Sequence, residues 1–281
     1  MGLYRVFHDI MDYMSDVIIS APPQKTLRVA TYNIHKCQGL DGRVRPGRIV
    51  DVLGKIDADI IALQEVVCIA GATPEDDQAE FIAKQLGFDA AFGHTREIRG
   101  GRYGNLLLTR FPIHISKNHD LSSPRREPRG CLRADIQLHD TTYHIYNLHL
   151  GTGFAERRHQ ARRILSERIF DYHGVLGPRI VVGDFNEWTR GAVSKLLASQ
   201  FSAADPRQHL KRSWTYPGVL PFLHLDHIYH DPTLRLKKLT LHRDRLSLVA
   251  SDHLPLVADF VAEDAAEAKR PLIELGTRQL I

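Results

Sequence analysis

The most informative segment of the sequence is Arg179-Ile180-Val181-Val182-Gly183-Asp184-Phe185-Asn186. Its β-branched run is typical of a strand covered on both faces, and Gly183 allows backbone or ligand to approach closely where the strand stops. Residues two apart in an extended chain point to the same side, so Asp184 and Asn186 are expected to face one site. An Asx turn that caps the strand would equally explain this pair taken alone.

Length and composition are those of a globular α/β protein. The 281 residues are 43% hydrophobic and 25% charged, enough for one large domain or two small ones, and we expect one. Lys and Arg number 37 against 33 Asp and Glu, and the sequence pI is about 9.0. This weak basic bias favours anionic partners, nucleic acid or lipid headgroups, without separating the two.

Cysteines and hydropathy bear on the compartment. Cys37, Cys68 and Cys131 are odd in number and scattered, which argues against a disulfide framework or a cysteine metal cluster and favours the cytoplasm. No apolar run is long enough to span a bilayer. A helical stripe from Leu3 to Val17 predicts an N-terminal helical extension over residues 1–24, docked on its own domain, on a second copy or peripherally on a membrane.

Hydrophobic periodicity predicts the elements of the main domain. A polar loop is expected to contain Arg96, Arg99 and Arg102. A helix is expected over 155–172, with Leu165 facing inward and Arg157 facing outward. Strands are predicted at 27–34, 59–64, 88–92, 106–109, 131–139, 141–149, 179–184, 225–229, 234–241 and 254–261, and helices from Pro46 and over 75–86, 155–172 and 192–199.

Polar side chains recur where predicted strands end. A β-α-β order places the ends of parallel strands at one edge, so Asn33 and Glu65 can meet there. Carboxylates and amides without cysteine suit a hard cation, Mg²⁺ or Mn²⁺. Because no lysine is expected among these acidic side chains, their mutual repulsion also calls for a bound cation. The full set is Asn33, Glu65, His149, Asp184, Asn186, Asp226, Asp252 and His253.

Several short motifs, in this order, resemble the endonuclease/exonuclease/phosphatase superfamily, which includes pancreatic-type deoxyribonucleases, abasic-site endonucleases, neutral sphingomyelinases and inositol-phosphate phosphatases. The resemblance covers about residues 27–261 and is carried by Thr31-Tyr32-Asn33-Ile34, Leu63-Gln64-Glu65-Val66, Gly104-Asn105-Leu106-Leu107, Asn147-Leu148-His149-Leu150, Gly183-Asp184-Phe185-Asn186, Leu225-Asp226-His227-Ile228 and Ser251-Asp252-His253-Leu254-Pro255. The Arg-Glu-Pro-Arg-Gly segment at 126–130 is similar to that of small bacterial members.

The resemblance implies an α/β fold, a four-layer α-β-β-α sandwich of two mixed sheets packed face to face with outer helices. Residues 25–262 would form the catalytic domain, with 263–281 as a C-terminal tail. The site would lie at one end of the sheets. No inserted wedge of the kind that abasic-site enzymes use is found, which argues against that activity.

The resemblance also implies roles for the polar residues around the metal and the water. Glu65 would hold the divalent ion, with Asn33 and Asp252 beside it directly or through water. Asp184 would orient and deprotonate the attacking water, and Asn186 would steady this water and the phosphoryl group.

Further residues are implied on the side of the substrate. His253, paired with Asp226, would stabilise the developing negative charge, because an adjacent carboxylate favours a protonated imidazole. His149 is implied at the leaving oxygen, with Asn105 to orient it or to contact the substrate. Arg126 or Arg129 would bind the phosphate.

These roles predict a divalent-metal-dependent phosphodiesterase. A nuclease acting on DNA is favoured by the Arg-Glu-Pro match and by the basic helix face from Arg157 to Arg163. The alternatives are a phospholipid or sphingomyelin-type phosphodiesterase, for which the N-terminal stripe would matter, and a phosphomonoesterase. A non-catalytic binding module would be favoured if one of four residues were replaced, and all four are present: Glu65, Asp184, Asn186 and His253.

Overall fold

The computed structural model describes residues 26–71, 73–98, 100–170, 176–211, 213–218 and 220–262. The predicted extension over 1–24, the predicted tail over 263–281 and Arg99 lie outside these residues. Within the described part of the chain, no helix is long and apolar enough to cross a membrane.

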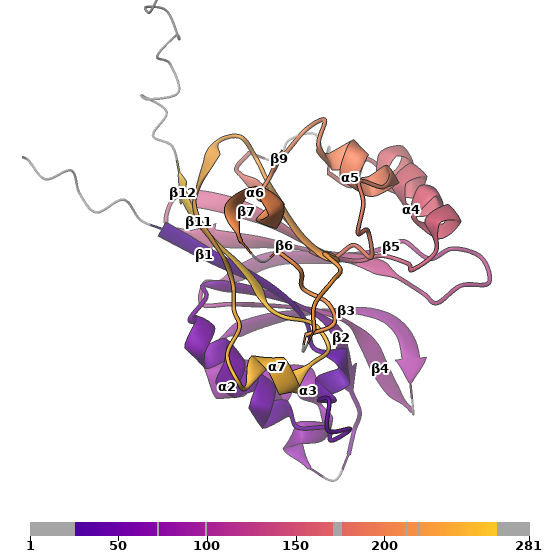
Figure 1. The fold of residues 1–281 in the computed structure, drawn as a ribbon, viewed down its shortest axis with the longest axis vertical. Coiled ribbons are helices and arrows are strands. Elements are labelled where there is room, and N and C mark those ends of the chain that lie inside the picture. Colours follow the sequence, from indigo (N-terminus) through magenta and orange to yellow (C-terminus); the bar gives the residue numbers. More distant parts are fainter. Residues whose placement is uncertain are drawn as a thin grey trace, which may run out of the picture.

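Two six-stranded sheets pack face to face, with helices on their outer sides (Figure 1). The first sheet has the order β11-β12-β1-β2-β4-β3 and the second the order β5-β6-β7-β8-β10-β9. Both are mixed, because β1 and β2 in the first sheet and β7 and β8 in the second run parallel while the other pairs are antiparallel. The predicted four-layer sandwich is thus confirmed.

The elements have the following bounds. The first sheet contains β1 (Thr26–Asn33), β2 (Ile60–Cys68), β3 (Asp89–Ile98), β4 (Gly101–Thr109), β11 (Leu234–Leu241) and β12 (Leu256–Ala262). The second contains β5 (Ile113–Asp120), β6 (Gly130–Leu138), β7 (Thr141–His149), β8 (Arg179–Asp184), β9 (Ser202–Ala203) and β10 (Asp226–His230). The helices are η1 (His35–Cys37), α2 (Pro46–Ile56), η2 (Pro74–Asp76), α3 (Gln78–Leu86), α4 (Phe154–Ser166), α5 (Ala192–Leu197), α6 (Pro206–His209) and α7 (Ser247–Ala250).

Side-chain alternation in the central strands separates three apolar layers. In β1, Val29 packs between the sheets, whereas Ala30 and Tyr32 pack against the layer of α2 and α3. A third cluster lies between the second sheet and α4 and α5. The same alternation turns Asn33, at the end of β1, toward the space between the sheets, so the polar strand ends cap the inter-sheet core.

Strand β2 does not stop at Glu65, as the sequence had suggested, but continues to Cys68. The pairing of β2 with β4 shifts register between Leu63 and Val66, and Glu65 has a φ of 60°. A bulge of this kind bends a strand and redirects one side chain, and it occurs often beside active sites. The polar residue marks a bulge rather than a strand end.

The prediction of a polar loop at Arg96 to Arg102 is wrong. Strands β3 and β4 pair as one long hairpin through Ile98 and Gly101. The guanidinium of Arg96 lies over the ring of Tyr103 (4.4 Å), and that of Arg102 over Phe92 (5.3 Å). Stacking on aromatic faces lets arginines occupy strand positions that charge alone assigns to a loop. Strand β5 was likewise not predicted, because its residues are mostly polar and exposed.

Helix α4 is shorter than predicted, and two side chains in its segment face the opposite way from the prediction. It ends at Ser166 rather than near 172, and Leu165 is 53% exposed. Arg157, expected outside, is only 6% exposed, and its Nη1 donates to the carbonyl oxygens of Gly151 and Thr152. Arg157 therefore fastens the turn between β7 and α4, whose carbonyls would otherwise be left unpaired.

Gly183 lies where β7 and β8 approach each other closely. Its φ is 143°, and an added Cβ would collide with the carbonyl oxygen of Leu148. Gly183→Ala should lower the free energy of unfolding by roughly 2–4 kcal/mol, from strained backbone and the collision together. Gly54→Ala in α2, where a Cβ would meet no atom within 4 Å, should instead be neutral or stabilising by up to about 1 kcal/mol. Denaturant titration checks both, and equal effects would contradict the packing argument.

Candidate active site

Asn33 joins the two sheets at the end where the polar residues gather. Its Nδ2 donates to Oε1 of Glu65 (3.2 Å) and to Oδ2 of Asp184 (3.0 Å). Its Oδ1 accepts from the main-chain N–H of His35 (3.0 Å), which fixes the orientation of the amide. One buried side chain therefore places a carboxylate from the first sheet and one from the second around the same point.

Asp184 lies at the centre of the cluster. Its Oδ1 accepts from the main-chain N–H of Asn186 (2.9 Å), and its Oδ2 lies 3.7 Å from Nε2 of His149 and 3.6 Å from Nε2 of His253. Asn186 has a φ of 51°, and its Nδ2 donates to the carbonyl oxygen of Leu150 (2.9 Å). The turn after β8 thus fixes both Asp184 and Asn186.

His253 is held in its protonated form. Its Nδ1 lies 2.9 Å from Oδ2 of Asp226, and both side chains are buried. Burial lowers the pKa of His253, but the charges of Asp226 and Asp184 outweigh it and raise the pKa to about 10. At neutral pH an imidazolium therefore lies between two carboxylates.

His149 is held in the opposite state. Burial, and next the charge of Arg129, lower its pKa to about 4. Nη1 of Arg129 lies 3.0 Å from Nδ1 of His149, and since a guanidinium can only donate, Nδ1 must accept. The neutral ring then carries its proton on Nε2, the nitrogen that faces Asp184.

Glu65 has a partner that the sequence did not predict. Nζ of Lys36 lies 2.7 Å from Oε2 of Glu65. Burial raises the pKa of Glu65, but neighbouring charges and hydrogen bonds, including those of Lys36 and Asn33, outweigh it and lower the pKa to about 2. The expectation that no lysine compensates the acids is wrong, because the turn after β1 brings Lys36 back over β2.

The remaining predicted residues are placed as follows. Asp252 contacts His35, with 3.7 Å between Oδ1 and Nδ1, and its side chain is 26% exposed. Asn105 is buried, and its Nδ2 donates to the carbonyl oxygens of Gly130 and Asn147. Asn105 was expected to orient His149 or to contact the substrate, and the side chain that lies against the ring of His149 is that of Arg129.

The two candidate phosphate-binding arginines differ in position. Arg126 is exposed on the turn between β5 and β6. Arg129 is 7% exposed, and its Nη2 donates to Oε2 of Glu127 (3.2 Å), whose other oxygen pairs with Arg96 (2.9 Å). Arg129 therefore supports His149, whereas Arg126 faces solvent.

Tyr216 was missed by the sequence analysis. Its ring centroid lies 4.9 Å from that of His253. Burial, and next the charges of Asp252, Asp184 and Glu65, raise the pKa of Tyr216, so its hydroxyl stays protonated near these carboxylates. Tyr216 belongs to an irregular segment without hydrophobic periodicity, and the aromatic-proline pair Tyr216-Pro217 was the one local signal available.

The donor set fits a divalent cation at Glu65 and Asn33. Asp184, Asp226 and His253 also lie close together, with one side-chain atom of each within 4.8 Å of the others. As an imidazolium, however, His253 carries a proton on both ring nitrogens and cannot bind a cation. Oδ1 of Asp226 is buried and has no hydrogen-bond partner among the described residues, so it can accept a further bond. Carboxylate and amide oxygens are the donors that Mg²⁺ and Mn²⁺ prefer.

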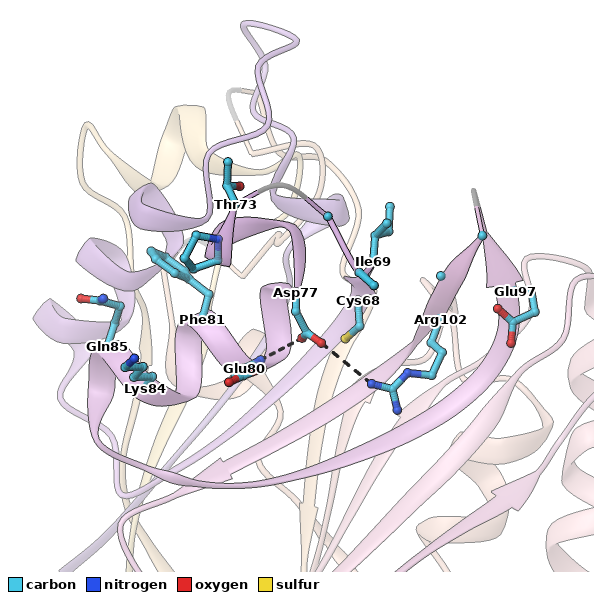
Figure 2. A pocket seen from close by; sticks show the side chains of 15 residues that line it. Cys68, Ile69, Thr73, Asp77, Glu80, Phe81, Lys84, Gln85, Glu97 and Arg102 are labelled. Carbon is cyan, nitrogen blue, oxygen red and sulfur yellow. Dashed lines mark hydrogen bonds and ion pairs between the residues drawn. The ribbon is translucent and has the colours of Figure 1, made fainter.

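A cavity of about 630 Å³ lies between α3 and the β3–β4 hairpin, and none of the predicted site residues lines it (Figure 2). Asp77 caps α3 by accepting from the N–H of Glu80 (3.0 Å) and faces Arg102 (3.9 Å). We therefore place the candidate active site at the strand ends and not in this cavity.

Comparison with known proteins agrees with this arrangement. The model of the Endonuclease/Exonuclease/phosphatase family matches residues 30–253. The uncharacterized protein YbhP of Escherichia coli K12 is 30% identical over 256 residues, covering 84% of this chain and 96% of YbhP.

Two solved structures share the fold. An endonuclease/exonuclease/phosphatase from Beutenbergia cavernae has a TM-score of 0.68 at 20% identity, covering 86% of this chain and 72% of its own. A mannosyl-6-phosphatase from Bacteroides thetaiotaomicron has a TM-score of 0.67 at 18% identity, and the match covers 84% of this chain and 99% of the phosphatase chain. The chain therefore belongs to the endonuclease/exonuclease/phosphatase family and is a hydrolase of phosphoester bonds.

Proposed function

We propose that the protein is a divalent-metal-dependent phosphodiesterase. The observation that carries this proposal is the surrounding of Asp184, whose Oδ2 lies within 3.7 Å of one cationic and one neutral histidine. A buried carboxylate can position and deprotonate a water, and the imidazolium of His253 can stabilise the charge that develops on the phosphoryl oxygens.

The other side chains divide the remaining tasks. Asn186 would steady the water and the phosphoryl group beside Asp184. Nε2–H of His149 would donate a hydrogen bond to the leaving oxygen, because a ring with a pKa of about 4 is an unsuitable proton reservoir at neutral pH. Glu65, with Asn33 and Asp252, would hold Mg²⁺ or Mn²⁺, which when bound supplies positive charge to the phosphoryl group.

We propose that the substrate is a nucleic acid. The basic surface that could bind it is smaller than the sequence indicated. Gln160 and Arg163 of α4 bond to Leu121 and Asp120 at the end of β5, so α4 lies beside the β5–β6 turn at one end of the sandwich (Figure 1). Several arginines of this region are engaged: Arg96 pairs with Glu127, Arg163 with Asp120 and Glu167, and Arg157 is buried. The exposed arginines of the β5–β6 turn and of α4 are Arg125, Arg126, Arg158 and Arg162.

Metal dependence and the role of Asp184 can be tested with bis-p-nitrophenyl phosphate. Hydrolysis should stop in excess EDTA and return with Mg²⁺ or Mn²⁺. Asp184→Asn should lower turnover by about a hundredfold or more, because a positioned base is lost, without a lower melting temperature. Asp120→Asn, which alters a carboxylate paired with Arg163 on the surface, is the control and should keep full turnover. Turnover in excess EDTA would contradict the proposal.

The state of His149 can be read by NMR titration of its ring protons. Burial, the charge of Arg129 and the charge of His253 lower this pKa, and Arg129→Met removes the second of these causes, so the pKa should rise above about 4. It should stay below the ordinary 6.5 because the ring remains buried. Arg126→Met should leave the titration unchanged. An unchanged pKa in Arg129→Met would show that the charge of Arg129 does not keep the ring neutral.

The substrate can be tested by nicking of supercoiled plasmid at several salt concentrations. Four exposed arginines predict a slope of about −4 for the logarithm of DNA affinity against the logarithm of salt concentration. Arg162→Met should reduce this slope by about 1, and Asp184→Asn should abolish nicking. Metal-dependent cleavage of phospholipid vesicles or of a phosphomonoester, without nicking, would assign one of the alternative substrates instead.

A further inference from the structure

Lys36 is the charged residue of the site to which the roles above give no task. Its Nζ lies 2.7 Å from Oε2 of Glu65, the carboxylate proposed to hold the divalent cation. The two side chains are 32% and 18% exposed, so water screens this pair only in part. Lys36 thus occupies one oxygen of a proposed metal ligand with its own positive charge.

The backbone around Lys36 is built to bring the ammonium to this point. His35, Lys36 and Cys37 all have positive φ, at 47°, 60° and 57°. Non-glycine residues rarely adopt this conformation, and then as single residues and not as runs. Such conformations persist only where the surroundings enforce them, often at functional sites.

Gln78 supplies that enforcement. Its Nε2 donates to the carbonyl oxygen of Lys36 (2.8 Å), and its Oε1 accepts from the N–H of Val67 (3.0 Å). Gln78 is 4% exposed, and its hydrogen bond to Val67 is buried while that to Lys36 is partly buried. Because Val67 is two residues beyond Glu65 on β2, this one amide fixes the turn of Lys36 relative to the strand of Glu65.

The ammonium has room to leave Glu65. Lys36 also lines a cavity of about 430 Å³ together with Gln38, Val67 and Ile69. A lysine on its four-carbon stem can swing into such a space without displacing packed side chains. Lys36 therefore stands between the proposed metal ligand and an open cavity.

We propose that Lys36 and the divalent cation alternate at Glu65. In the metal-free protein the ammonium neutralises the carboxylate. When the cation binds, two positive charges cannot share these oxygens, so the ammonium moves away and binds a phosphoryl oxygen of the substrate. This inference rests on the proposed function, because it requires Glu65 to hold the cation.

Binding of Mg²⁺ alone, measured by isothermal titration calorimetry, tests the exchange without any turnover. Lys36→Met should bind Mg²⁺ roughly threefold to tenfold more tightly than the wild type, because the cation no longer displaces an ammonium. Its melting temperature in EDTA should be lower, because Glu65 is left unpaired. Weaker or unchanged Mg²⁺ binding in Lys36→Met would overturn the exchange.

Lys55→Met is the matched control. Nζ of Lys55 also lies 2.7 Å from a carboxylate oxygen, Oδ2 of Asp244, but this pair joins α2 to the segment before α7. Its loss should leave Mg²⁺ affinity unchanged.

Two further variants of Lys36 complete the series. Lys36→Gln removes the charge but keeps a hydrogen-bond donor, and it replaces Lys36→Met if the methionine variant does not fold. Lys36→Arg keeps the charge and should bind Mg²⁺ like the wild type.

Inorganic phosphate is the probe for the second half of the exchange. With saturating Mg²⁺, Lys36→Met should bind phosphate roughly tenfold more weakly, as expected for one lost charge-assisted hydrogen bond. Unchanged phosphate affinity would overturn the phosphate role of Lys36.

Glu65→Gln separates failure of this inference from failure of the proposed function. If Glu65→Gln binds Mg²⁺ as tightly as the wild type, Glu65 is no ligand, and both the metal assignment and the exchange fail. If Mg²⁺ binding depends on Glu65 but is the same in Lys36→Met, the metal assignment stands and the exchange alone is overturned.

Discussion

A buried pair of side-chain amides, Gln64 and Asn147, connects the two sheets directly behind the site. Nε2 of Gln64 donates to Oδ1 of Asn147 (2.8 Å), and Nδ2 of Asn147 donates to the carbonyl oxygens of Leu63 and Leu106. Apolar faces alone tolerate sliding, whereas hydrogen bonds are directional, and leaving one of these buried groups unpaired costs about 1–3 kcal/mol. Gln64 precedes Glu65, and Asn147 lies two residues before His149, so the register of the catalytic strand ends follows from this contact.

The site built on this register is a balance of buried charges. Three carboxylates, Glu65, Asp184 and Asp226, lie among three cationic groups, Lys36, Arg129 and His253. Buried charges are stable only when they are paired, and the pairing here is uneven. Carboxylates on both sides of His253 keep its proton in spite of burial, while burial, and next the charge of Arg129, lower the pKa of His149 and keep its ring neutral. Two histidines of one site thereby acquire different chemistry from their neighbours and not from their own sequence context.

Two errors of the sequence interpretation have a common cause. Arginine was read as a marker of solvent, yet Arg157 is buried because the carbonyls of the β7–α4 turn need a donor, and Arg96 lies in a strand because Tyr103 offers a ring. In each case the arginine side chain meets a partner at a position that hydrophobic periodicity does not register. The basic surface left for a nucleic acid is smaller than the count of arginines suggested.

The sequence by itself determined most of the strands and the polar residues at their ends, and the resemblance of its motifs to a known family implied the layers of the sandwich. The alternation of β1 and the apolar run of β8 are local information, and Asn33 and Asp184 lie at the ends of these strands. Only the tertiary structure decided that Lys36 pairs with Glu65, that Arg129 supports His149, and that Tyr216 packs on His253. These contacts depend on a run of left-handed residues, on a bulge in β2 and on the meeting of distant loops. Each of these is stabilised by packing between segments far apart in the chain, so no local pattern encodes it.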